Sequence, residues 1–427
     1  MKTVIRPESE MKDSGITWIG NIPKYWKFVK LNYVHEISNV GESIDRKYWS
    51  EDISDTFFYT AGVLPIHTKY ENFPKWKYTK DNDLLLSRNG TPYIYLPISH
   101  SVYTDHIIRI SVKDEYDKRF VRYCLQQSIG AVVVDTVSIP TWSISLWNKQ
   151  YITVPPLSEQ QAIADYLDET CSKIDEIIAE AKASIDEYKE LKQSVIFEAV
   201  TKGLDKNVEM KDSGVEGMGF IPAKWPVVRF MKVNYVRARL GWKGLKAEEY
   251  VDVGYPFLAA YHIVNGHLCW ENLNCITKER YDESPEIKLS IGDLVLVKDG
   301  AGIGKCARID DMPLGEATVN SSLSVITPNK LLDYRYEYYY FMSPLFQNII
   351  ARLKNGMGVP HLTQESMKDI YLPLPSKNEQ QAIADYLDNK MIGLDSLIAE
   401  KESLINDLEA YKKSLIYEVV TGKRRVV

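Results

Sequence analysis

The sequence predicts an α+β protein in which two α/β domains are separated by two long helices that form an antiparallel coiled coil, with an internal pseudo-two-fold repeat. The decapeptide EQQAIADYLD occurs at residues 159–168 and again at 379–388. Ten identical positions do not recur by chance in a chain of 427 residues, so a duplicated structural unit is indicated. Apolar residues at helical spacing follow each copy, whereas the long stretches between the repeats have little identity.

Both ends of each half are repeated. SVIFEAVTKG (194–203) matches SLIYEVVTGK (414–423) at the offset of the decapeptide, 379 − 159 = 220. MKDSGITWIGNIPKYW (11–26) matches MKDSGVEGMGFIPAKW (210–225) at an offset of 210 − 11 = 199. Because the offsets differ by 220 − 199 = 21, the second copy holds an insertion between its matched ends. Because the ends of the two halves match while their middles have little identity, we expect both halves to share one fold and to carry different surfaces.

The repeats predict six segments along the chain. They are an N-terminal repeated segment at 1–23, a first variable domain at 24–157, a central helical region at 158–203, a connecting segment that repeats the first at 204–222, a second variable domain at 223–375, and a distal helical region at 376–427.

A helix is predicted to start at each decapeptide, with Ser158 or Asn378 as the N-cap before the glutamate. After a short first helix, a second, long amphipathic helix is predicted. Its apolar stripe is Ile174, Ile178, Ala181, Ile185, Tyr188, Leu191, Val195 and Ala199 in the first copy, and Leu394, Ile398, Ile405, Leu408, Tyr411, Leu415 and Val419 in the second, with Lys401 as a polar substitution. At about 1.5 Å per residue, 171–202 would extend about 48 Å. The stripes favour a coiled coil between the two helices, and the alternative is two helices each packed on its own domain.

The variable domains are predicted to contain a sheet and a helix each. The stretches 250–270 and 293–309 alternate β-forming residues with glycine turns, and 117–129 and 333–353 have helical patterns at matching places. GAGIGKC (300–306) fails the phosphate-loop pattern GxxxxGK[ST] at two positions, so it is interpreted as a glycine hairpin. The tyrosine-rich run at 334–340 is interpreted as a core-facing helix.

Composition limits the class of protein without identifying it. No apolar run approaches the roughly 20 residues that span a bilayer, and the first residues contain no hydrophobic signal region, so a cytoplasmic protein is expected. The five cysteines contain no CxxC pair and are expected to be free thiols rather than disulfides or zinc ligands. Net charge is −6, but 158–202 alone holds 5 basic and 11 acidic residues. The variable regions are therefore near neutral, and the overall charge neither supports nor excludes DNA.

The sequence contains none of the common catalytic patterns. The seven histidines contain no HExxH, and GxSxG is absent. We therefore expect a chain that is not a catalyst by itself. Two similar domains with different surfaces, held at a fixed spacing, suit the recognition of two separate sites on duplex DNA, whose successive turns lie about 34 Å apart.

Both repeated segments, MKDSGIxWIGxIPxxW and PPLxEQxxIAxYLD, resemble the specificity subunits of type I restriction-modification systems, over essentially the whole chain. The resemblance implies two target-recognition domains that each read one half of a bipartite double-stranded DNA target, with an unread spacer measured by the helices. It also implies docking of two modification (methyltransferase) subunits that methylate adenine, and of restriction subunits that act as ATP-dependent translocases and nucleases. S-adenosylmethionine, ATP and Mg would belong to those partners, leaving no cofactor, metal or catalytic residue here. The first domain departs from the family in SRNGTPYIY (87–95), where the second has the more typical VKDGAGIGK (297–305).

Candidate DNA contacts lie in basic loops of the variable domains, because Lys and Arg bind phosphates while Arg and Asn can also read guanine and adenine edges. The candidates are Arg46, Lys47, Arg88 and Asn89 in the first domain, and Arg239, Trp242, Lys243, Lys246, Lys298 and Lys305 in the second. Trp242 could equally anchor the core, and any single residue could be an ordinary surface charge. The repeated residues Trp26, Trp225, Pro23 and Pro222 are interpreted as structural.

Candidate partner contacts lie in the decapeptide, because two identical partners need two identical binding surfaces. They are Gln160, Gln161 and Asp165 in the first copy and Gln380, Gln381 and Asp385 in the second. The alternative is that these residues cap and pack the start of the helix. For the whole chain, the alternatives to DNA recognition are a coiled-coil scaffold that binds polypeptides and a self-sufficient nuclease or methyltransferase. Sequence-dependent DNA binding would argue against the scaffold. Nuclease or methyltransferase activity of the purified single chain would support the self-sufficient enzyme.

Overall fold

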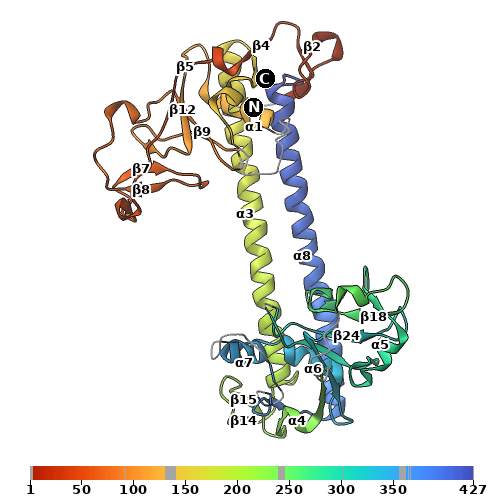
Figure 1. The fold of residues 1–427 in the computed structure, drawn as a ribbon. Helices are drawn as coiled ribbons and strands as arrows, with labels where there is room; N and C mark the ends of the chain where they lie inside the picture. The colour runs from red at the N-terminus through yellow and green to blue at the C-terminus, as the bar shows by residue number, and fades with distance from the viewer. Residues whose placement is uncertain are drawn as a thin grey trace. The chain divides into compact units, whose positions relative to one another are not determined.

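The chain folds as two compact units. A computed structural model describes residues 3–90, 92–129, 141–238, 246–300, 302–354, 362–363, 365 and 367–426. Unit 1 consists of Met1–Lys182 and Ser403–Val427, and unit 2 of Ala183–Glu402. Each unit therefore contains one variable domain together with part of both long repeated helices, α3 (Leu157–Lys202) and α8 (Lys377–Val420) (Figure 1).

Each unit contains an antiparallel four-stranded sheet with the same topology. In unit 1 the order is β10 (Ile94–Tyr95), β9 (Asp83–Ser87), β12 (Ile107–Val112) and β5 (His35–Val40). In unit 2 it is β23 (Cys306–Arg308), β22 (Leu294–Val297), β25 (Leu323–Pro328) and β17 (Asn234–Arg237). The strands β9 and β22 are completely buried, as expected for near-continuous apolar strands in the middle of a sheet. The two variable domains thus share one topology despite their different sequences.

A second sheet in each unit contains one parallel pair, β7 with β11 and β18 with β24. In unit 1 the strands are β11 (Val102–Tyr103), β7 (Thr56–Tyr59), β8 (Ile66–Thr68) and β6 (Trp49–Ser50). In unit 2 they are β21 (Cys275–Ile276), β18 (Tyr255–Leu258) and β24 (Thr318–Val319), beside the short hairpin β19 (Ile263–Val264) and β20 (His267–Leu268) and the helix α5 (Lys278–Asp282).

Each large sheet contains an ion pair between an arginine and a buried aspartate. Asp83 begins β9 and its carboxylate lies 3.5 Å from Arg109, while Asp293 precedes β22 and lies 2.9 Å from Arg237. Arg109 comes from β12, whereas Arg237 comes from β17, so the two domains supply the cation from different strands. The similarity between DLLLSRNG and DLVLVKDG therefore predicts the position of the aspartate in both domains, but not which strand supplies the arginine that pairs with it.

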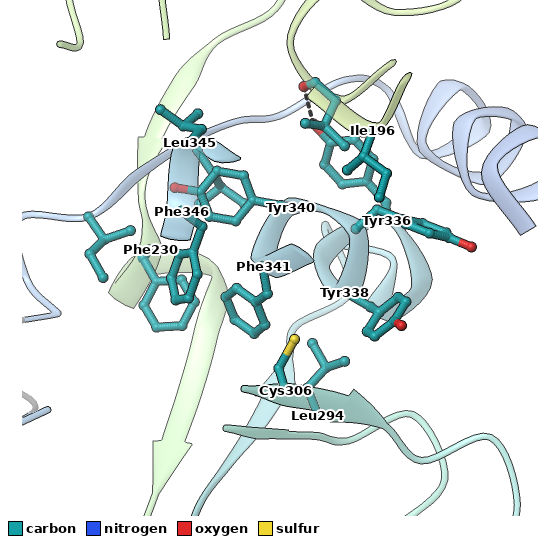
Figure 2. Close-up of a cluster of buried hydrophobic side chains, with 14 of the residues drawn as sticks. Ile196, Phe230, Leu294, Cys306, Tyr336, Tyr338, Tyr340, Phe341, Leu345 and Phe346 are labelled. Atoms are coloured by element: carbon teal, nitrogen blue, oxygen red, sulfur yellow. Dashed lines mark hydrogen bonds between the residues drawn. The ribbon is translucent and has the colours of Figure 1, made fainter. Parts of the chain in front are cut away.

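Helices pack on the sheets where the pattern predicted them. The first is α1 (Lys118–Ile129). In unit 2 the predicted single helix over 333–353 is wrong, because α6 (Tyr334–Met342) and α7 (Pro344–Lys354) are separated at Ser343, where proline lacks the N–H that a continuing helix needs. The tyrosine-rich run is confirmed as core, since Tyr336, Tyr338 and Tyr340 are buried around Phe341, Phe346 and Cys306 (Figure 2).

The repeated segments form matching hairpins and strand pairs at the ends of each variable domain, and we call these elements the frame. Matching hairpins are β2 (Met11–Asp13) with β3 (Asn21–Pro23) and β14 (Met210–Asp212) with β15 (Phe220–Pro222). Matching strand pairs are β4 (Lys27–Lys30) with β13 (Tyr151–Val154) and β16 (Val227–Arg229) with β26 (Tyr371–Pro373). Two short α-helices of the described residues are α2 (Ile144–Asn148) and α4 (Phe230–Val233).

Trp26 and Trp225 are buried in this frame, and their indole N–H groups donate to Glu159 at 3.1 Å and Glu379 at 3.3 Å. The structural interpretation of the repeated tryptophans is thereby confirmed. In unit 1 the frame is completed by pairing of β1 (Thr3–Ile5) with β27 (Arg424–Val426), with Thr3 opposite Val426.

Two predictions about the long helices need correction. There is no short first helix followed by a long one, because α3 and α8 are each continuous from the decapeptide. Ser158 and Asn378 are not the N-caps, since both lie inside the first turn. Before α8, Ser376 and Glu379 exchange the capping bonds: the Ser376 backbone N–H donates to the glutamate at 2.9 Å, and the Glu379 N–H donates to the Ser376 hydroxyl.

The buried stripes also differ from the predicted ones at equivalent positions. Leu191 and Tyr411 are exposed, at 43% and 50%. The stripe passes instead through their neighbours Lys192 and Lys412, which are largely covered. In unit 2 the ammonium of Lys192 pairs with Asp395, and in unit 1 that of Lys412 pairs with Asp175 at 2.6 Å. Lysine stems cover apolar surface while their charged ends reach an acid, so a lysine can occupy a stripe position.

The cysteines of the described residues are all free thiols, with Cys124, Cys171 and Cys306 buried. Within the same residues, no helix is long and apolar enough to cross a membrane. No group of three or more potential metal ligands occurs in the part of the chain that the structure describes.

Candidate nucleic-acid interface

In unit 1, Arg88 and Asn89 lie where β9 ends and are held by the turn before β12. The Arg88 backbone N–H donates to the carbonyl of His106 at 2.8 Å, and its guanidinium lies 3.4 Å from the carbonyl oxygen of Asp105. The Asn89 amide is 2.8 Å from Nδ1 of His106. Arg88 is exposed, so a planar guanidinium with several N–H donors stands at the surface on a backbone that is held by His106.

The same turn brings in residues that sequence reasoning missed. The hydroxyls of Ser43 and Thr104 both donate to the Asp105 carboxylate, at 2.5 and 2.9 Å. The Ser43 bond is the main reason that the pKa of Asp105 lies below its ordinary value, so this carboxylate is an acceptor at neutral pH. No spacing pattern connects 43, 88 and 105, which come together only because β5, β9 and β12 share a sheet.

Arg46 and Lys47 lie in a short 3-10 helix three residues beyond Ser43, and both are exposed. The Arg46 guanidinium stacks over Trp49 at 5.3 Å, and Lys47 pairs with Asp45 at 3.6 Å. Trp49 itself is 42% exposed, which leaves an aromatic face beside a cation at the surface. Cations and exposed aromatic rings together suit phosphate and sugar contacts.

The candidates of unit 2 have less uniform environments. Lys305 is exposed at the hairpin between β22 and β23, which confirms the glycine-hairpin interpretation of this loop. Lys298 is largely covered, and its ammonium lies 3.0 Å from Asp299. Lys246 is exposed, and its backbone N–H donates to Glu249 at 2.7 Å. The other three candidates, Arg239, Trp242 and Lys243, lie outside the described residues.

Lys305 borders a groove of about 1500 Å³ within unit 2. The groove also receives Lys189 and Lys192 from α3 and His267 from the β19–β20 hairpin, while Asp388, Asp395 and Glu402 contribute acidic groups from α8. The structure therefore brings one predicted residue together with cations that were not predicted, in a groove of mixed charge.

The candidate partner residues fall into two classes. Gln160 and Gln380 are buried and bonded within the chain: each side-chain carbonyl accepts the backbone N–H of Asp117 or Asp333, at 2.9 and 2.7 Å. Their amides donate to the carbonyls of Pro155 and Pro375, at 2.9 and 2.8 Å. A side chain without exposed surface cannot contact a partner, so docking is not retained for these two glutamines, and the capping alternative describes them.

The other four candidates reach the surface. Asp165 and Asp385 are exposed but pair with Arg119 at 2.8 Å and Arg335 at 2.7 Å. The side chains of Gln161 and Gln381 are exposed. Gln161 and Asp165 are four residues apart, as are Gln381 and Asp385, so each pair shares one helix face.

Comparison with known proteins agrees with this arrangement. A family model described as the type I restriction modification DNA specificity domain matches residues 23–187 and 241–409. The chain is 24% identical over 420 residues to the type I restriction enzyme MjaVIII specificity subunit of Methanocaldococcus jannaschii, covering 95% of this chain and 94% of that protein. It is 22% identical to the EcoBI specificity subunit of Escherichia coli, covering 86% and 77%. A solved chain from a study of complex assembly and conformational transition of the type I R-M system has the same fold, with a TM-score of 0.69, 15% identity, and coverage of 94% and 99%.

Proposed function

This chain belongs to the type I restriction-modification DNA specificity family, and we propose that its two variable domains, residues 24–157 and 223–375, are target-recognition domains that each read one half of a bipartite DNA target. The chain is the sequence-specificity subunit of such a system, and its role is to recognise DNA rather than to catalyse a reaction. The observation that carries the division into two readers is that two sheets of identical topology present different loop residues. An unread spacer separates the half-sites.

The helical regions, 158–203 and 376–427, are proposed to form an antiparallel coiled coil that sets the spacer length. The equivalent ion pairs Lys192–Asp395 and Lys412–Asp175 support it. Their residue numbers have the same sum, 192 + 395 = 412 + 175 = 587, as expected when two helices run in opposite directions in one register. The segments 1–23 and 204–222 complete the frame that supports each domain.

The DNA contacts are proposed at Arg46, Lys47, Arg88 and Asn89 in the first domain and at Lys246, Lys298 and Lys305 in the second, with Arg239, Trp242 and Lys243 retained from the sequence. Exposure of the Arg88 side chain and the bond that holds its backbone to His106 support a base-reading role. Asp105 joins them as an acceptor suited to the amino group of cytosine. Lys298 is the weakest member, because Asp299 already neutralises it.

Partner docking is proposed at Gln161, Asp165, Gln381 and Asp385, which lie on matching exposed helix faces. Two copies of a modification subunit would bind there and bring S-adenosylmethionine for adenine methylation. Restriction subunits, which use ATP and Mg, would join that core and cleave unmodified DNA. Replacing Gln161 and Gln381 together by lysine should reduce copurification of the modification subunit without changing the melting temperature. Unchanged copurification would remove this surface from the proposal.

The main experiment maps N6-methyladenine across the genome of cells that express this chain with its modification subunit, beside cells that lack this chain alone. Methylation at one split sequence that depends on the chain supports the proposal and supplies both half-sites and the spacer. An Arg88→Ala variant should then relax the preference within the first half-site only, whereas Lys27→Ala, an exposed lysine elsewhere in unit 1, should not. If no methylation depends on the chain, the proposal fails.

A further inference from the structure

Each variable domain is attached to its long helix by the same polar network. In unit 1 the guanidinium of Arg119, on α1, lies 2.8 Å from Asp165 and 2.9 Å from Asp168, both on α3. The hydroxyl of Tyr123, one turn further along α1, donates to Asp168 at 2.7 Å. Arg119 therefore connects two carboxylates one turn apart, and Tyr123 holds the second of them.

The second copy reproduces these contacts with different surrounding residues. Arg335, on α6, lies 2.7 Å from Asp385 and 3.3 Å from Asp388, both on α8. The hydroxyl of Tyr339 donates to Asp388 at 2.7 Å. The arginine and the tyrosine lie in the variable domains, where the two halves share little sequence, yet they recur in the same roles.

The glutamine caps belong to the same attachment. The side chain of Gln160 accepts the backbone N–H of Asp117 just before α1, and that of Gln380 accepts the N–H of Asp333 just before α6. Each domain helix is thus bonded to the long helix at its first turn and again one or two turns later. Contacts at several levels along a helix restrain its rotation as well as its distance, which a single contact would not do.

We infer that Arg119 with Tyr123, and Arg335 with Tyr339, are positioning residues that fix the angle between each target-recognition domain and its helix, and thereby the separation of the two half-sites that the chain accepts. The inference rests on the proposed function. A domain that turns on its helix displaces the DNA-reading loops at its far end. Relaxing the attachment should broaden the accepted spacer lengths while leaving base choice within each half-site intact.

One difference between the units sharpens the inference. In unit 2, Arg308 from β23 also binds Asp388, at 2.7 Å, and stacks over Tyr338 at 5.2 Å. This residue connects the sheet of the second domain directly to α8. Loss of Arg335 should therefore loosen the second domain less than loss of Arg119 loosens the first.

The test measures methylation by the complex of the full chain with its modification subunit, on duplexes that carry both half-sites with the native spacer or with one base pair more or fewer. Arg119→Met should raise the rate on altered spacers relative to the native one by about fivefold, the effect expected from losing a partly exposed, doubly bonded ion pair. Arg335→Met should give a smaller change in the same direction. Base preference within each half-site should stay as in the wild type.

Matched controls remove exposed cations elsewhere. Lys173→Met breaks a surface pair with Glu169 on α3, and Arg352→Met breaks a surface pair with Glu216. If Arg119→Met destabilises the chain, Tyr123→Phe removes one bond of the network and should broaden the spacer profile to a smaller degree. The inference is overturned if the methylation rates of Arg119→Met at the three spacer lengths have the same ratios as those of Lys173→Met. It is also overturned if Arg119→Met lowers the methylation rate equally at all three spacer lengths. If the wild-type complex methylates none of the duplexes, the proposed function itself fails.

Discussion

A buried glutamate in unit 2 makes the stability of this protein depend on pH in a direction opposite to that of most acids. Glu337 lies on α6 near Tyr340 and Cys306 and is completely buried. Burial raises the pKa of its carboxyl to about 8, only partly opposed by the bond that it accepts from the Asn234 amide. The oxygens Oδ1 of Asn234 and Oε2 of Glu337 are both buried and have no hydrogen-bond partner within the described residues. A proton on Oε2 would donate to Oδ1 and close a two-bond acid–amide pair.

Replacing Glu337 by glutamine should stabilise the protein relative to wild type by an amount that grows from about pH 4.5 and is largest above pH 8. The folded state holds the proton up to about pH 8, whereas the unfolded chain releases it near 4.5, so between these values the folded state binds more protons and the free energy of unfolding falls as pH rises. At about 1.36 kcal/mol per pH unit, the loss over that window is roughly 5 kcal/mol. Glutamine matches the protonated acid in shape and donates to Asn234 at every pH.

Thermal unfolding of Glu337→Gln and wild type, followed from pH 5 to pH 9, measures this difference. The variant should unfold at nearly the wild-type temperature at pH 5 and on the order of 10 °C higher at pH 9, since about 1 kcal/mol shifts a unit of this size by 2–4 °C. Glu190→Gln, on the exposed side of α3, is the matched control and should give a small shift at every pH. A difference between Glu337→Gln and wild type that does not change with pH would refute the reasoning.

Three further predictions concern the frame and the sheets. Gly422 has φ +73°, and a Cβ there would lie 2.5 Å from Cδ of Pro23. Gly422→Ala should therefore lower the free energy of unfolding of unit 1 by roughly 2 kcal/mol or more, measured by chemical denaturation. The control Gly393→Ala, where a Cβ on α8 meets no atom within 4 Å, should not lower it. Asp293→Leu removes the buried carboxylate that Arg237 binds. It should lower the free energy of unfolding by roughly 3 kcal/mol, because it leaves a largely covered cation without this carboxylate, and the double variant Arg237→Met, Asp293→Leu should recover part of that loss. Gln380→Leu leaves the N–H of Asp333 and the carbonyl of Pro375 without the bonds described here, and hydrogen exchange at the start of α6 should accelerate at least tenfold, with α1 unaffected.

The sequence predicted what depends on local pattern and on repetition. The duplicated helices, the core roles of Trp26 and Trp225 and the glycine hairpin at 300–306 follow from spacing and identity, and the structure agrees with them. The structure also explains most of the identity between the two decapeptides by contacts inside each unit, since Glu159, Gln160 and Asp165 all bond to other residues of the chain. Identity alone cannot distinguish such internal contacts from a surface for an external partner.

The errors have tertiary causes. The apolar pattern predicts Leu191 and Tyr411 in the buried stripe. In the structure Lys192 and Lys412 take those positions, because an aspartate on the opposite helix accepts each ammonium. Asp105 and Ser43 were missed because residues 62 apart in sequence meet only across a sheet. Which loop residues contact bases was not predictable either, because base choice depends on the approach of the loop to the groove as well as on residue type.

Completion of unit 1 by residues 403–427 has a consequence for synthesis on the ribosome. Leu415, Ile416, Val419 and Val420 belong to the same hydrophobic core as Ile163 and Trp147, and β27 pairs with β1. These residues follow all of unit 2 in the chain, so unit 2 can close its core first although unit 1 begins to emerge earlier. At about 5–20 residues per second, the first half waits roughly ten seconds or more with an apolar surface uncovered. Released chains truncated after residue 402 should therefore recruit chaperones through their first half, while their second half, which then has its whole core, resists proteolysis.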